Sequence, residues 1–200
     1  MFKIYMEILG VTGGIGAGKS TVIKIFKEKG YSVYNSDIRA KKLMEENDSL
    51  KQGIINLLGK KAYLNGSLNR SFIAQKIFTN HELLKQQNKL VHAEVKKDFK
   101  NWVSEQSGKF CIKETAILFE SESYKDCNYT LVVTAPERLR IKRVMKRDNI
   151  PEDKVKLRIK NQWPQEKLIK LSDFHISNDS SIENLNKQVK SIINILENQI

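Results

Sequence analysis

The chain has 200 residues, of which 40% are hydrophobic, enough for one sizeable core and a smaller lobe, and this excludes disorder as the main state. A net charge of +12 favours polyanionic partners without choosing among nucleic acid, anionic membrane and phosphorylated small molecules. The amino end lacks the apolar stretch of a secretory signal, and no segment approaches the roughly 20 apolar residues that span a bilayer, so we expect no membrane partner. Two cysteines, Cys111 and Cys127, indicate a reducing compartment rather than a disulfide scaffold, and we expect a cytoplasmic location.

Short apolar runs alternate with longer amphipathic segments along the chain, as is typical of an α/β protein with a mainly parallel sheet. Each of the three prolines is followed within two residues by a glutamate. Because proline fits the first helical position and carboxylates stabilise that end, these pairs indicate helix starts. The runs that predict strands are residues 8–12, 32–34, 110–118, 130–134 and 174–177, and the helix starts are at Pro136, Pro151 and Pro164.

The first predicted strand leads directly into a glycine-rich stretch. Residues 13–20, Gly-Gly-Ile-Gly-Ala-Gly-Lys-Ser, fit the pattern G-x-x-x-x-G-K-[ST], and a segment of helical period follows. In such a loop the backbone N–H groups bind phosphate oxygens, Lys19 contacts the terminal phosphates and the Ser20 hydroxyl ligates Mg²⁺. The stretch predicts a nucleoside triphosphate site, and the absence of N-K-x-D and D-x-x-G favours ATP over GTP.

The second predicted strand ends at Asn35-Ser36-Asp37. Ligands of open parallel sheets lie beyond the carboxyl ends of the strands, so we expect Asp37 on the same rim as the glycine loop. There the carboxylate can accept a proton from an attacking hydroxyl or hold water around Mg²⁺. It can equally serve as the N-cap of a helix over residues 38–46. Position alone leaves both roles open.

About seventy residues separate the second and third strands, far more than an ordinary connection in an α/β protein. An apolar stripe at helical spacing predicts a long helix over residues 81–105. We interpret residues 59–106 as an inserted helical lobe, entered through a turn at residues 64–67, and residues 1–58 with 107–200 as the core. The stripe consists of Leu84, Val91, Val95, Phe99 and Trp102.

Charged residues follow the third and fourth strands. Glu114 and Glu120 flank the end of the third strand and either can reach the rim, although strand alternation gives Glu114 the weaker claim. Arg140, Arg143 and Arg147 share one face of the helix after the fourth strand. Such a face can clamp polyphosphate during transfer, where positive charge stabilises the developing negative charge. A solvated basic helix is the alternative interpretation.

The order and spacing of these pieces resemble those of the dephospho-coenzyme A kinases over essentially the whole chain. The resemblance implies a nucleotide-binding core with a five-stranded parallel sheet, a helical substrate-binding lobe at 59–106 and a mobile lid at about 138–165. It implies transfer of the γ-phosphate of ATP to the 3′-hydroxyl of dephospho-coenzyme A. The matching pieces are residues 10–21, 36–41, 66–70 and 117–120, Arg143, Arg147-Asp148, Gln162 and residues 173–178.

The resemblance also implies roles for single residues. Asp37 matches the family's general base, and Lys19 and Arg147 match groups that act on the transferred phosphate. The family usually has aspartate where this chain has Asn35, so a pair of carboxylates is not available there. The residues implied for ATP and Mg²⁺ are Gly14, Gly16, Ala17, Gly18, Lys19, Ser20, Thr21, Arg143 and Asn178, with Ser20 on the metal, and those for the acceptor are Lys41, Arg70, His92, Phe119 and Glu120.

Two other functions stay open from the sequence. A different small-molecule kinase, such as a nucleoside monophosphate or sugar kinase, would share the core and lid. The basic charge also suggests a nucleotide-dependent nucleic-acid binder, but the chain has no recognisable nucleic-acid module and little interleaving of aromatic with basic residues. We therefore expect small-molecule substrates, no nucleic-acid partner, and a monomer or weak homo-oligomer.

Overall fold

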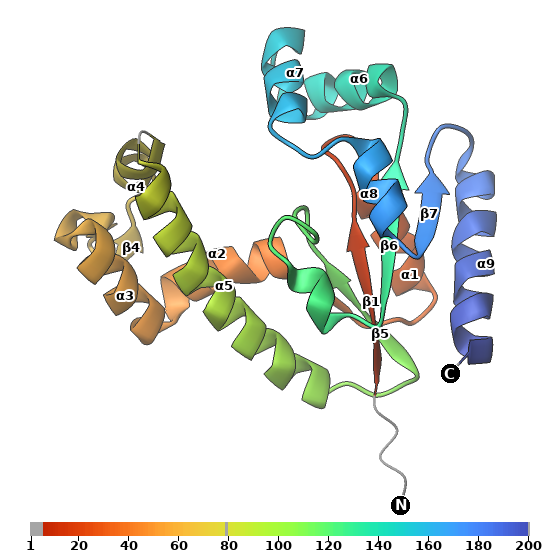
Figure 1. Ribbon diagram of the computed structural model, residues 1–200, viewed down its shortest axis with the longest axis horizontal. Coiled ribbons are helices and arrows are strands. Elements are labelled where there is room, and N and C mark those ends of the chain that lie inside the picture. Colours follow the sequence, from red (N-terminus) through yellow and green to blue (C-terminus); the bar gives the residue numbers. More distant parts are fainter. Residues whose placement is uncertain (1–5, 79, 200) are drawn as a thin grey trace, which may run out of the picture. The chain divides into compact units, whose positions relative to one another are not determined.

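The computed structural model describes residues 6–78 and 80–199, which form two compact units (Figure 1). The sheet unit contains the chain up to Tyr34 and from Gln106 onward, and the helical unit contains Asn35–Glu105. Over the part of the chain that the structure describes, no helix is both long and apolar enough to cross a membrane.

The sheet unit is built on five strands, counted over the described residues, in the order β2-β5-β1-β6-β7. Strand β1 pairs in parallel with β5 and β6, and β6 pairs in parallel with β7, which confirms the predicted α/β fold. The elements of this unit are β1 (Glu7–Thr12), α1 (Lys19–Glu28), β2 (Val33–Asn35, ending at the unit boundary), β5 (Phe110–Glu114), η2 (Ser123–Asp126), β6 (Tyr129–Thr134), α6 (Glu137–Asp148), α7 (Glu152–Lys160), α8 (Gln165–Leu171), β7 (Phe174–Ser177) and α9 (Ile182–Gln199).

Both faces of this sheet are covered, as parallel sheets require. Along β6, Leu131 and Val133 pack in the cluster that contains the buried side chains of α1 and α9, whereas Val132 packs with Leu168 of α8 on the opposite face. Figure 1 shows α8 against β6 and α9 beside β7. The central strands therefore hold the loops at their carboxyl ends on a rigid base.

The third strand is shorter than the sequence predicted. Strand β5 ends at Glu114 instead of residue 118, because the hydroxyl of Thr115 accepts a hydrogen bond from the backbone N–H of Ile117 at 3.3 Å and the chain turns there. Leu118 and Phe119 are still buried, but in the cluster beneath α8 and not as strand residues. The apolar run correctly predicted that these residues are buried, but it predicted too long a strand.

The other boundaries in the sheet unit follow local sequence signals. Helices α6, α7 and α8 begin directly after Pro136, Pro151 and Pro164, which confirms the predicted helix starts. Helix α9 buries an apolar stripe against the sheet from Leu185 onward, although Ile182 at its start is 49% exposed.

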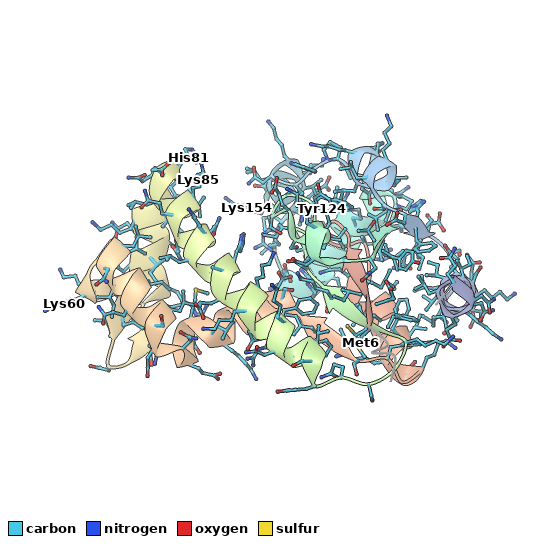
Figure 2. The ribbon with its side chains drawn as sticks, turned by 60° about the horizontal axis from the view of Figure 1, so that its bottom comes forward. Met6, Lys60, His81, Lys85, Tyr124 and Lys154 are labelled. Atoms are coloured by element: carbon cyan, nitrogen blue, oxygen red, sulfur yellow. The ribbon has the colours of Figure 1, made fainter. Side chains whose placement is uncertain are left out.

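Among the described residues of the helical unit, three helices pack against one long helix, α5, which confirms the helix predicted over residues 81–105, and a small hairpin lies against one of the other helices. Figure 2 shows His81 and Lys85 one turn apart at the amino end of α5. Asn65 and Gly66, both with positive φ, form the predicted turn. The elements are α2 (Ser36–Glu46), α3 (Asp48–Leu58), η1 (Lys60–Ala62), β3 (Tyr63–Leu64), β4 (Ser67–Leu68), α4 (Arg70–Phe78) and α5 (His81–Ser104).

The helical unit begins at Asn35, upstream of residue 59 where the sequence placed its start. The reason is packing, since α2 and α3 both lie against α5. Arg39 of α2 donates from Nε to the Asp98 carboxylate of α5 at 2.9 Å, which joins the two helices. Asp37 and Lys41 on α2 therefore belong to the helical unit, together with Arg70 and His92.

Candidate functional site

The glycine loop connects β1 to α1 and has a backbone that few other residues could adopt. Gly16 and Gly18 have φ of 76° and 92°, in the left-handed region that glycine adopts without strain. A Cβ atom on Gly16 would also lie 2.5 Å from the backbone oxygen of Arg140, and one on Gly13 would lie 2.5 Å from the backbone oxygen of Val133. Both conformation and close approach therefore account for the glycines.

Side chains from outside the loop hold its carbonyl groups. Arg140 Nε donates to the Ile15 oxygen at 2.9 Å, and Arg143 Nη1 donates to the Gly16 oxygen at 3.4 Å. Asn178 Nδ2 donates to the oxygen of the next residue, Ala17, at 2.9 Å. Three successive carbonyls are thus bound on one side, which leaves N–H groups to face an anion.

The N–H groups of the loop divide into two sets. Gln162 Oε1 accepts from the Ile15 N–H at 2.8 Å, so the segment after α7 is tied to the loop. Within the described residues, the backbone N–H groups of Gly16, Gly18 and Ser20 bond to no protein acceptor. Unpaired N–H groups at the start of a helix form an anion site.

A cavity of about 580 Å³ opens over the loop, within the size range of small-molecule sites. Glu114, Ala116 and Gln162 line it beside the predicted nucleotide residues. Ala17 does not reach it, because its side chain is fully buried below the loop. The predicted residues that the structure brings together here are Gly14, Gly16, Gly18, Lys19, Ser20, Thr21, Arg143, Arg147 and Asn178.

Glu114 lines the cavity, although the sequence pattern gave it a weaker claim than Glu120 to reach the rim. It ends β5 opposite Val11 of β1, and its Oε1 lies 3.4 Å from Lys19 Nζ in a largely buried ion pair. Glu120, which had the stronger claim, does not line the cavity. Only the strand order, with β5 next to β1, identifies the nearer carboxylate, and the sequence does not reveal that order.

The oxygen ligands at the cavity are suited to a magnesium ion that is held mainly by the phosphates of a nucleotide. Among residues 6–78 and 80–199 no cluster of three or more His, Cys, Asp or Glu side chains could hold a metal alone. Mg²⁺ commonly takes one or two protein groups and completes its shell with substrate phosphates and water. The exposed Ser20 hydroxyl and the Glu114 carboxylate at the same cavity supply such groups.

The three α6 arginines at positions 140, 143 and 147 have different contacts. Arg140 is only 5% exposed and supports the loop from below; burial lowers the pKa of its guanidinium, and the nearby Glu137 and Glu166 oppose that effect. Arg143 bridges the Gly16 and Asn178 backbone oxygens, the latter at 3.0 Å from Nη2. Arg140 and Arg143 lie on the predicted shared face with Arg147. Because both bind backbone oxygens, the alternative of a solvated basic helix does not describe them.

Two predicted acceptor residues lie in the sheet unit. The Phe119 ring is buried and its centroid lies 5.3 Å from that of Tyr124, so packing accounts for it. The Oε2 atom of Glu120 is buried without a hydrogen-bond donor among the described residues. A buried acceptor without a partner is uncommon in native proteins, so this oxygen calls for a donor from a ligand or water.

Asp37 lies in the first turn of α2, but it is not the cap of that helix. Helix α2 begins at Ser36, and the Asn35 side chain accepts the backbone N–H of Ile38 at 2.8 Å. Asn35 is therefore the N-cap, and the capping alternative for Asp37 is wrong. Asparagine is among the preferred N-cap residues, so Asn35 favours this helix start.

The remaining predicted acceptor residues lie on three helices of the helical unit. Lys41 is exposed on α2, and Arg70 at the start of α4 donates from Nη2 to Glu45 Oε1 at 2.7 Å. His92 is half-buried on α5, and burial lowers its pKa. With an ordinary pKa near 6.5, that direction makes His92 neutral at pH 7 and a hydrogen-bonding group rather than a cation.

Comparison with known proteins decides the family. The family model described as dephospho-CoA kinase matches residues 7–184. The chain belongs to the dephospho-CoA kinase family. It is 40% identical over 170 residues to a dephospho-CoA kinase of Porphyromonas gingivalis, an alignment that covers 85% of this chain and 84% of that protein.

Solved structures agree with this membership. Dephospho-CoA kinase from Campylobacter jejuni matches with a TM-score of 0.70 and 25% identity, over 96% of this chain and 98% of that one. TT1252 from Thermus thermophilus matches with a TM-score of 0.84 and 30% identity over the same shares. Membership of the dephospho-CoA kinase family makes the chain a kinase and confirms the resemblance inferred from its motifs.

Proposed function

We propose that this dephospho-CoA kinase family member transfers the γ-phosphoryl group of ATP to the 3′-hydroxyl of dephospho-CoA, giving CoA and ADP. The cavity over the glycine loop carries the proposal, because its N–H groups, Lys19 and two arginines suit a triphosphate. Phosphoryl transfer depends mainly on positioning and on stabilising negative charge, and this set of groups provides both.

On the nucleotide side, the loop N–H groups bind the phosphates and Lys19 neutralises the transferred group. Lys19 is paired with Glu114 at 3.4 Å, so binding ATP exchanges a carboxylate partner for phosphate oxygens. Arg143 and Arg147 at the same cavity add positive charge where negative charge develops during the transfer. Ser20 and Glu114 are the residues that would hold Mg²⁺, which when bound neutralises phosphate charge.

On the acceptor side, Asp37 is the proposed general base. The Asn35 side chain caps α2 by accepting the backbone N–H of Ile38, so the Asp37 carboxylate is not needed as a cap. A carboxylate in this position is suited to accept the ribose hydroxyl proton. Lys41 and Arg70 supply charge for the pyrophosphate of the acceptor, and neutral His92 supplies a hydrogen bond. The unpartnered Glu120 oxygen suits a hydroxyl or amino donor of the substrate.

The inserted helical lobe and the lid at about 138–165 remain part of this proposal, with the lobe now taken as the helical unit. We also infer a cytoplasmic location, because the thiols of Cys111 and Cys127 are free, as is usual in a reducing compartment. A monomer or weak homo-oligomer stays a prediction, which size-exclusion chromatography with light scattering would test.

The experiment that tests the function is a panel of acceptors with ATP and Mg²⁺, with product masses recorded. The panel contains dephospho-CoA, AMP, CMP, dTMP, gluconate and shikimate. We expect dephospho-CoA alone to gain one phosphate group at a substantial rate. Phosphorylation of another acceptor while dephospho-CoA stays unchanged would agree with the proposed nucleotide site but would refute dephospho-CoA as the acceptor.

A further inference from the structure

One carboxylate at the end of α6 binds two arginines. Arg147 donates from Nε to Asp148 Oδ1 at 2.7 Å and from Nη2 to Oδ2 at 3.1 Å. Arg158, on α7, donates from Nη1 to the same Oδ2 at 2.7 Å. Helix α7 packs against α6 (Figure 1), so Asp148 joins the two helices as well as the two side chains.

The geometry leaves one end of Arg147 available. Asp148 binds the guanidinium along its Nε edge, a paired contact that fixes the plane of the group. The Nη1 amino group has no protein acceptor in the described part of the chain, and Arg147 lines the nucleotide cavity whereas Arg158 does not. Asp148 therefore restrains a flexible side chain without using all its donors.

The charges of this trio also suit phosphate binding. Two guanidinium groups and one carboxylate leave a net charge of about +1, because arginine stays protonated at any ordinary pH. The hydrogen bond from Arg147 holds the pKa of Asp148 below its usual range, with a further contribution from Arg158, so the carboxylate is charged at neutral pH. Arg158 keeps Asp148 paired even when Arg147 engages a phosphate.

We propose that Asp148 is a positioning residue that directs Arg147 at the transferred phosphoryl group, and that Arg158 anchors Asp148 from α7. This inference rests on the proposed role of Arg147 in phosphoryl transfer. It gives a functional role to Asp148 and Arg158, neither of which lines the nucleotide cavity. Asp148 acts only through Arg147, and that dependence separates it from a residue that merely stabilises the lid.

The test is a double-mutant cycle measured as kcat and as KM for ATP. Asp148→Asn should lower kcat about tenfold, because a misdirected arginine loses transition-state contacts. KM for ATP should not rise, because removing a negative charge near the cavity does not weaken binding of a polyanion. In an Arg147→Ala background, Asp148→Asn should change kcat by less than about twofold.

The matched control is Glu152→Gln. Glu152 is also an acidic residue of the α6–α7 region, but it pairs with Lys156 on its own helix at 2.7 Å, whereas the ion pairs of Arg147 and Arg158 among the described residues are with Asp148. Its kcat should stay within about twofold of wild type. Arg158→Gln should reproduce the loss seen in Asp148→Asn to a smaller extent, and it supplies the test if Asp148→Asn fails to fold.

Three results would overturn the inference: wild-type kcat in Asp148→Asn, equal losses in the two backgrounds, or wild-type kcat in Arg147→Ala. The four proteins of the cycle are also compared on slow ATP hydrolysis without an acceptor. If dephospho-CoA proves not to be the acceptor, the proposed function fails, and the hydrolysis cycle still decides for or against Asp148.

Discussion

The sheet unit and the helical unit hold their charged residues in different ways. In the sheet unit, Arg140, Arg143 and Asn178 each bond to a loop carbonyl, and Lys19 pairs with Glu114 at the same cavity. In the helical unit, the proposed acceptor residues lie on three separate helices, and Arg70 pairs with Glu45. The glycine loop is thus held by contacts within one unit, whereas we expect the residues proposed for the acceptor to gain a common partner only when the substrate binds.

If this contrast holds, the largest effect should come from the preformed nucleotide site. Lys19→Met should lower kcat/KM about a thousandfold or more, because the charge that stabilises the transferred phosphoryl group is lost in a largely water-excluded position. Steady-state coupled assays measure this. Lys24→Met on the same helix is the control, since Lys24 is exposed and its ion-pair partner among the described residues is Glu28, at 3.7 Å. Comparable losses in both variants would contradict the assignment of Lys19.

The next largest effect is expected for Asp37. Asp37→Asn should lower turnover by at least about a hundredfold while ATP binding stays nearly intact, because the base acts on the acceptor and not on the nucleotide. Calorimetry for ATP and initial rates for dephospho-CoA separate the two effects. Asp48→Asn is matched to it, because Asp48 is also in the first turn of a helix of the same unit and its side chain is 96% exposed. Near-normal turnover of Asp37→Asn would refute the base assignment.

A smaller effect should separate the two partners of the Arg70–Glu45 ion pair. Arg70→Gln should raise KM for dephospho-CoA about tenfold with little change in KM for ATP, as expected when one charged contact to an acceptor is removed. Glu45→Gln releases Arg70 from its competing partner, so KM for dephospho-CoA should not rise. Equal increases in both variants would mean that the ion pair supports α4 and α2 and that Arg70 does not bind the acceptor.

The smallest effect concerns His92 and pH. Burial lowers its pKa in the folded chain, so between the unfolded pKa near 6.5 and the lower folded value the unfolded state binds more protons. The contribution of His92 to the free energy of unfolding is therefore present above that range and is lost as the pH falls through it. Urea titrations at pH 7.5 and 5.5 should show less acid destabilisation in His92→Gln than in wild type; an unchanged pH dependence would contradict the burial effect.

Local signals in the sequence predicted most elements of the sheet unit and one turn of the helical unit. The glycine loop, the helix starts after the prolines and the Asn65-Gly66 turn each depend on a few neighbouring residues, and the structure confirms all three. The end of β5 was missed because Leu118 and Phe119 are buried in a turn, and a hydrophobic run does not distinguish that from a longer strand.

What the sequence could not supply were features set by contacts between distant segments. Glu114 reaches the cavity because β5 pairs with β1, and the helical unit begins at Asn35 because α2 and α3 pack on α5. The role of Asn35 as a cap also required the exact start of α2, and helix ends are the least certain part of a sequence prediction. The residues proposed for the acceptor stay predictions for the same reason.

The proposed reaction is tested most directly by the position of the phosphate group that the protein adds. Purified protein, ATP, Mg²⁺ and dephospho-CoA are incubated together, ADP is quantified, and tandem mass spectrometry locates the new phosphate in the product. We expect one ADP for each CoA formed, with the phosphate on the ribose 3′-oxygen. A phosphate at another position, or ADP released without phosphorylated acceptor, would contradict the proposed reaction.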